Sequence, residues 1–126
     1  MRGLAFAALL ACGCAQTAER VGDRFVDLYL VEIDQARARE LTSGLATKKL
    51  DDELRLVADV RRTVDRAAAK PTVFYRRRSA RVEGERAQLA YDVTVKFGAD
   101  ATKKNALLSM ERTDGRWRVA NFIVDD

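Results

Sequence analysis

The sequence predicts an α+β domain in which three N-terminal helices pack on a four-stranded antiparallel meander sheet. Two observations carry this prediction. Apolar residues recur about every 3.6 positions between Ala15 and Ala69, and the period changes to two from Thr72 onward. Short turn sequences separate the alternating segments, so consecutive strands should pair antiparallel. By length, residues 15–126 form one domain.

The helical half is expected to divide at two positions. The first helix has an apolar stripe of Val21, Phe25, Leu28, Tyr29, Ile33 and Ala36. Asp34 is placed to cap a second helix from Gln35 to Ser43, which Gly44 would end. Asp51-Asp52-Glu53 puts negative charge at the start of a third helix, which Lys70-Pro71 ends. Its stripe is Leu54, Val57, Val60, Val64 and Ala68.

The second half is expected to hold four strands. They are Val73–Val82, Arg86–Phe97, Lys103–Arg112 and Arg116–Val124. Glu83-Gly84 predicts a two-residue turn, Gly98–Thr102 a loop, and Asp114-Gly115 a hairpin. The clearest strand places Ala87, Leu89, Tyr91, Val93, Val95 and Phe97 on one face. Alternation breaks between Val119 and Phe122, which predicts a bulge in the last strand.

Residues 1–14 have the features of a bacterial export signal. A basic Met1-Arg2 precedes the uncharged apolar run Leu4–Ala11, which is far shorter than the roughly 20 residues of a membrane-spanning helix. A helix that packs on the core of the domain would have polar residues on one face, and this run has none. Leu9, Ala11 and Cys12 resemble a lipobox, which implies lipidation of Cys12 and a membrane anchor. The alternative is cleavage after Ala15, which would release a soluble periplasmic protein.

Cysteine usage and charge argue against disulfides, metal sites and nucleic-acid binding in the domain. The two cysteines, Cys12 and Cys14, both lie in the signal segment, so the domain should contain no disulfide. The chain has no histidine, and two cysteines are too few for a metal site, so no metal or cofactor is expected. A net charge of +4 is too modest to indicate nucleic-acid binding.

Several segments together resemble the nuclear transport factor 2-like (cystatin-like α+β) superfamily. They are Phe25–Tyr29, Asp34–Ala38 with the break at Gly44, Ala87–Val93, and Asp114–Val119 followed by Phe122. The resemblance spans Ala18–Val124 and implies a curved sheet that folds around helices into a cone with a pocket. Some members are isomerases or dehydratases, and many exported members are non-catalytic lipoproteins. This chain departs from the pattern because no strand is expected between its second and third helices.

Candidate catalytic residues are few. Without histidine, acid–base chemistry would fall to carboxylates and tyrosine, namely Asp34, Asp92 and Tyr91. Strand alternation points Asp92 away from the core if Tyr91 faces it, and a helix cap is the simpler explanation of Asp34. These residues therefore favour structural roles over catalysis.

Two binding sites are also candidates. An apolar pocket for a small hydrophobic molecule would be lined by Phe25, Tyr29, Tyr75, Leu89, Tyr91 and Trp117. The same residues would equally form a filled core. An anion-binding patch would comprise Arg76, Arg77, Arg78 and Arg81, because guanidinium groups bind oxyanions bidentately. Its alternative is a solvated strand whose charges oppose edge-to-edge association.

The sequence thus predicts an exported, lipid-anchored, non-catalytic binding or scaffolding domain of the cell envelope. Its expected partners are the membrane, through the anchor, and a small hydrophobic ligand or an envelope protein. One alternative is a small-molecule isomerase or hydratase that uses a pocket carboxylate and a tyrosine. Another is a subunit of an envelope complex that docks through the outer face of the sheet.

Overall fold

The structure is a computed structural model that describes residues 16–60 and 70–125 of the chain. The helical segments are α2 (Ala18–Val26), η1 (Asp27–Val31), α3 (Gln35–Arg39) and α4 (Gly44–Val60). The strands are β1 (Thr72–Glu83), β2 (Arg86–Phe97), β3 (Asp100–Thr113) and β4 (Arg116–Asp125). The predicted α+β class and helix-then-meander order are confirmed: the sheet is open, antiparallel and ordered β1-β2-β3-β4. The predicted export signal with Cys12, Cys14 and Ala15 lies outside the described residues, as do Val64 and Ala68.

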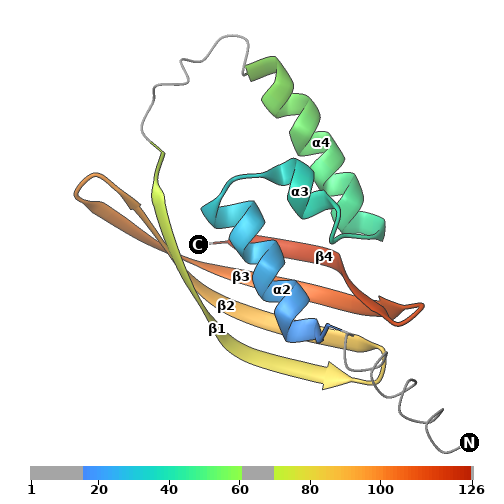
Figure 1. The fold of residues 1–126 in the computed structure, drawn as a ribbon. Helices are drawn as coiled ribbons and strands as arrows, with labels where there is room; N and C mark the ends of the chain where they lie inside the picture. Colours follow the sequence, from blue (N-terminus) through green and yellow to red (C-terminus); the bar gives the residue numbers. More distant parts are fainter. Residues whose placement is uncertain (1–15, 61–69, 126) are drawn as a thin grey trace, which may run out of the picture.

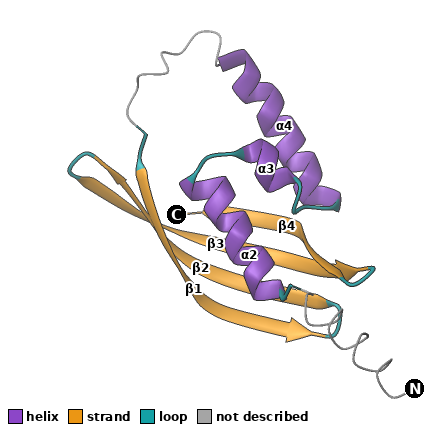
Figure 2. Cartoon of the chain, viewed as in Figure 1, coloured by secondary structure: helices purple, strands orange, loops and turns teal. Residues whose placement is uncertain are grey.

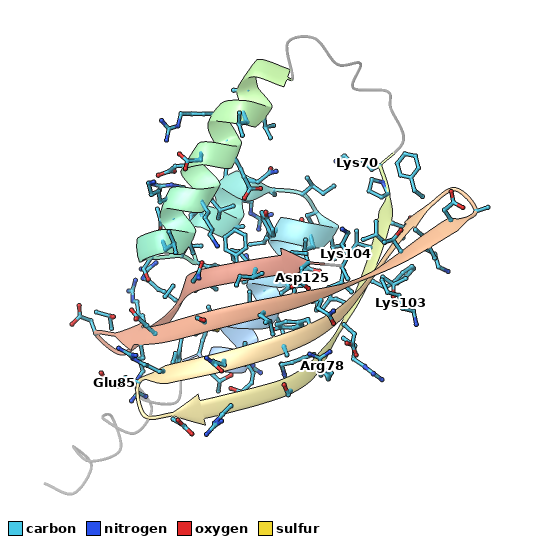
Figure 3. The ribbon with its side chains drawn as sticks, turned by 180° about the vertical axis from the view of Figure 1, so that it is seen from behind. Lys70, Arg78, Glu85, Lys103, Lys104 and Asp125 are labelled. Atoms are coloured by element: carbon cyan, nitrogen blue, oxygen red, sulfur yellow. The ribbon has the colours of Figure 1, made fainter. Side chains whose placement is uncertain are left out.

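The helices lie on one side of the sheet, which leaves the other side uncovered in the described part of the chain (Figures 1 and 2). We call the side that packs against the helices the inner face; its buried residues on β2 include Leu89, Tyr91 and Val93. We call the opposite side the outer face; Asp92 and Thr94 lie there by the alternation of β2. Figure 3 views the molecule from behind the sheet.

The first helix begins and ends by identifiable contacts. The Thr17 hydroxyl accepts a hydrogen bond from the Arg20 amide at 3.2 Å and caps α2. α2 continues directly into the π-helical turn η1, where the Glu32 amide donates to the Asp27 carbonyl at 2.9 Å. The helix stops at Ile33, whose φ of 54° is incompatible with a further turn.

The predicted end of the second helix and the predicted start of the third helix are wrong. α3 ends at Arg39 rather than Ser43, because the segment that follows is held against β4. The Val119 amide donates to the Leu41 carbonyl at 2.8 Å, and the Ser43 amide donates to the Val119 carbonyl at 2.9 Å. Gly44 does not end the second helix but begins α4, seven residues before Asp51. Ala46 and Leu50, one turn apart, are both 0% exposed and bury this early part of α4.

The strands agree more closely with the sequence. β2 has the predicted bounds, and Asp114-Gly115 forms the predicted hairpin with φ of 54° and 75°. The first turn is Gly84-Glu85 instead of Glu83-Gly84, because Glu83 pairs with Arg86. The predicted loop Gly98–Thr102 shrinks to two residues, since Phe97 already pairs with Asp100.

Two irregularities interrupt the ladder of the sheet. In β4, Val119 pairs with Met110 and Asn121 pairs with Ser109, so Ala120 is an extra residue and the predicted bulge is confirmed. In β1, a second bulge lies between Arg77 and Ser79. The sequence did not indicate this one, because charged residues surround it and no apolar alternation breaks there.

The core lies between the inner face and the helices. Its largest fully buried side chains are Tyr91, Phe25, Leu28, Leu50, Leu89, Leu108, Met110, Val26, Val93 and Val119. Burial of each such apolar side chain contributes roughly 1.5–3 kcal/mol to folding. α2 approaches the sheet closely at Gly22, where an added Cβ would lie 2.2 Å from Leu89 Cδ1. This helix–sheet contact fixes which polar side chains meet at the inner face.

Candidate functional site

A hydrogen-bonded cluster joins α2 to β1 and β2 on the inner face. The Tyr91 hydroxyl donates to Asp23 Oδ1 at 2.7 Å, and Arg77 Nη1 donates to Asp23 Oδ2 at 2.6 Å. The Tyr75 hydroxyl donates to the Asp23 carbonyl oxygen at 3.3 Å. Burial, and then the bond to Asp23, raise the pKa of Tyr91 well above its ordinary value. At neutral pH this phenol therefore stays protonated and donates a hydrogen bond that holds α2 against β2.

A second tyrosine–carboxylate pair joins η1 to α4. The Tyr29 hydroxyl contacts both Glu53 oxygens, at 2.7 and 2.9 Å. Burial, followed by the bond to Glu53, raises the pKa of Tyr29. The Tyr29 ring stacks on Phe25 at 5.4 Å between centroids and meets Phe122 edge-on at 4.9 Å. Sequence reasoning missed Asp23 and Glu53, because these pairs depend on how helices dock and leave no periodic signal.

The predicted pocket residues take part in the packed core. Phe25, Leu89, Tyr91 and Trp117 are at most 9% exposed and belong to the core cluster, while Tyr29 and Tyr75 pack against it. The Tyr75 and Tyr91 rings meet edge-on at 6.0 Å between centroids. The arrangement favours the packed-core interpretation of these six residues.

The candidate catalytic carboxylates do not lie beside Tyr91. Asp34 accepts a hydrogen bond from the Arg37 amide at 3.1 Å and caps α3. Asp92 binds Arg78 at 2.9 Å and Arg76 at 3.3 Å, and its side chain is 42% exposed. Asp92 lies on the outer face, whereas Tyr91 lies on the inner face with 0% exposure. A general acid and base facing one substrate are therefore not assembled from these three residues.

The arginine run is divided between the two faces. Arg77 reaches inward to Asp23, whereas Arg76 and Arg78 share Asp92 on the outer face. Arg81 pairs with Glu83 at 2.8 Å further along β1. The four side chains thus do not form one patch, and only Arg76 and Arg78 act together.

Among the hollows of the described residues, two on the outer face include exposed aromatic or aliphatic side chains. The first, which we call the basic groove, has a volume of about 480 Å³ and is lined by Phe74, Tyr75, Arg76, Asp92, Val93, Thr94, Lys103, Lys104 and Asn105. The Phe74 ring is 54% exposed, and the Lys96 ammonium lies 5.5 Å from its centroid. Figure 3 labels Arg78 and Lys103 at this end of the sheet. The sequence predicts only the arginines of this groove. The pairing of β3 with β2 places Lys103 beside them.

The second hollow, which we call the apolar groove, measures about 430 Å³ and is lined by Ser79, Arg81, Gln88, Leu89, Ala90, Leu107, Leu108, Ser109, Asn121, Phe122 and Ile123. Leu107 and Ile123 pair across β3 and β4 and are 46% and 48% exposed. Asn121 Oδ1 is buried beside it without a hydrogen-bond partner. Leu107 and Ile123 thus place two neighbouring aliphatic side chains at the surface of this face.

Within residues 16–60 and 70–125, no cluster of three or more His, Cys, Asp or Glu side chains could hold a metal ion. None of the described helices has the length and apolar character needed to cross a membrane. The chain matched no protein-family model, no curated protein and no solved structure.

Proposed function

We propose that the protein is an exported, lipid-anchored, non-catalytic binding domain of the cell envelope that binds through the outer face of its sheet. One observation carries the binding role: the helices occupy the inner face, while the outer face stays open and contains both grooves. The apolar run Leu4–Ala11 followed by Cys12 supports export and lipidation.

The positions of the ionisable groups support a non-catalytic role. Acid–base catalysis requires a proton donor and a proton acceptor within reach of one substrate. Asp34 is engaged as a helix cap, and Asp92 is separated from Tyr91 by the thickness of the sheet. The raised pKa of Tyr91 also makes its phenol a poor proton donor at neutral pH.

We further propose membership of the nuclear transport factor 2-like superfamily, with a curved sheet. The order of elements, the Asp34 cap and the Asp114-Gly115 hairpin support this proposal. Bulges bend strands, so those at Arg77/Ser79 and Ala120 supply a source of curvature. The described chain from α3 to α4 contains no strand element, which remains a departure from the family pattern.

Membrane fractionation of Cys12→Ser tests the anchor. We expect this variant to move to the soluble fraction, because it lacks the thiol that carries the lipid. Cys14→Ser is the matched control and should stay with the membrane. A Cys12→Ser protein that still fractionates with the membrane would contradict lipidation at this residue. A wild-type protein that is soluble and begins at Gln16 would instead support cleavage after Ala15.

The apolar groove favours a second candidate, a subunit of an envelope protein complex. Leu107 and Ile123 would enter the interface, since both are about half exposed and adjacent. A photo-crosslinking residue at position 107 should then capture one discrete envelope protein in intact cells. The same residue at Leu56, which is 67% exposed on α4, should capture none.

A further inference from the structure

The basic groove is built from two rows of side chains that cross three strands. Phe74 pairs with Thr94, and Thr94 pairs with Lys103, which forms the first row. Arg76 pairs with Asp92, and Asp92 with Asn105, which forms the second. Neighbouring strands lie about 4.8 Å apart, so each row spans roughly 10 Å, and the rows are about 7 Å apart along the strands. The groove thus matches one or two sugar rings in size, within the usual range for ligand sites.

Positive charge dominates the surroundings of this groove. Arg76, whose side chain is 81% exposed, and Arg78 share the single carboxylate of Asp92, so one guanidinium charge remains uncompensated. Lys96 and Lys103 add charge from β2 and β3. Asp125, which pairs with Asn105 in register, extends the second row with a further carboxylate. An anionic group is therefore favoured at the Arg76–Lys103 side of the groove.

The groove also presents groups that a bare anion would not use. Phe74 offers an exposed aromatic face, and apolar C–H surfaces such as those of a sugar ring pack on aromatic faces. The Thr94 hydroxyl can donate to or accept from a sugar hydroxyl, and the Asn105 amide nitrogen can donate to one, while Asn105 Oδ1 accepts from Arg78 Nη1 at 3.3 Å. We infer that the basic groove binds an acidic saccharide, with its ring on Phe74 and its carboxylate or phosphate beside Arg76 and Lys103.

The position of the groove selects the source of this ligand. α2 begins over the end of the sheet that holds the β1–β2 hairpin, and the basic groove lies toward the opposite end (Figure 1). The nine residues from Phe74 to Val82 span about 26 Å of β1, at roughly 3.3 Å for each of the eight steps. On the proposed function, on which this inference rests, the anchor precedes α2 in the chain, and the groove lies at the end of the sheet away from the start of α2. The ligand is thus an acidic glycan polymer of the envelope rather than a headgroup of the anchoring bilayer.

Direct titration of the full chain in a neutral detergent tests this assignment. The probe is trigalacturonic acid, and the comparison ligands are the neutral galactose trimer and inorganic phosphate. We expect the acidic trimer to bind at least tenfold more tightly than either, because only it engages both the ring and the cations. Phe74→Ala and Lys103→Ala should each weaken binding about tenfold, as expected for one lost stacking or charge contact. Leu107→Ala, in the apolar groove, should leave it unchanged.

Three results would overturn the inference. They are no binding of the acidic trimer, equal binding of phosphate with no effect of Phe74→Ala, and groove-dependent binding to vesicles of anionic lipid. None of these depends on lipidation of Cys12, because the titration uses detergent-solubilised protein. Failure of the ligand assignment is therefore distinguishable from failure of the anchor, which fractionation of Cys12→Ser reports.

Discussion

Gly22 shows how a single residue sets the distance between helix and sheet. A Cβ at this position would lie 2.2 Å from Leu89 Cδ1 and 2.9 Å from the Tyr91 hydroxyl oxygen. Leu89 is 1% exposed, and the Tyr91 hydroxyl is held by Asp23, so moving either side chain away would cost free energy. The close approach also brings Asp23 within reach of β1 and β2.

Substitution of Gly22 by alanine should therefore destabilise the protein. Alanine is intrinsically favoured over glycine in a helix by about 1 kcal/mol, but overpacking a core costs about 1–3 kcal/mol. We expect a net loss of stability in urea unfolding, whereas the exposed Arg24→Ala in the same helix should change it by less than about 0.5 kcal/mol. A Gly22→Ala protein as stable as wild type would show that the helix lies further from the sheet.

The tyrosines predict an alkaline pH dependence. The pKa values of Tyr29, Tyr75 and Tyr91, the three tyrosines of the chain, are all raised above 10.0 in the folded state, chiefly by burial. The folded protein then holds these protons more tightly than the unfolded chain. Their contribution to stability is complete below pH about 10 and is lost as the pH rises through and beyond that value.

Ultraviolet absorbance of tyrosinate measures this directly. We expect it to appear above pH about 10 together with the loss of far-ultraviolet circular dichroism, and Tyr91→Phe should make the loss of stability less steep. Titration of all three phenols at their ordinary pKa in an intact fold would contradict the buried hydrogen bonds to Asp23 and Glu53.

At the scale of the element, α3 depends on its cap. This five-residue helix is too short to be stable alone, and Asp34 is its N-cap side chain. Asp34→Ala should cost about 0.5–2 kcal/mol in thermal or urea unfolding, whereas Asp34→Asn should be nearly neutral, because asparagine caps equally well. If the asparagine variant were as destabilised as the alanine variant, the charge of Asp34 rather than its capping bond would be what matters.

The elements differ in how far the sequence predicts them. β2 was predicted residue for residue, because its alternating apolar positions are all read locally and a turn bounds it on each side. The junction of α3 and α4 was not predicted correctly, since Leu41 and Ser43 hydrogen-bond to Val119, almost 80 residues away. Ala46 and Leu50 did not indicate the start of α4, because small residues and two lysines in the segment 44–50 weaken its apolar stripe.

The candidate site was predicted in part for the same reason. Alternation along the strands correctly separated Asp92 from Tyr91, and Arg77 from Arg76 and Arg78. The basic groove depends on cross-strand neighbours, since Lys103 meets Phe74 only through Thr94. The turns on both sides of β2 set this register, and both differ from the predicted turns, so the grouping needed the structure.

At the scale of the whole molecule, the two faces of the sheet have different roles. The inner face is joined to the helices by the core and by the Tyr91–Asp23 and Tyr29–Glu53 bonds. The outer face contributes little to that core. The binding proposal rests on this open outer face, and the anchor proposal rests on residues 1–14 of the sequence.

Intact mass spectrometry of the protein purified from its native membrane tests the central proposal most directly. The proposal predicts a chain that begins at Cys12 and carries added acyl mass, with residues 1–11 removed. A chain that retains Met1 and carries no acyl group would contradict export and lipidation together.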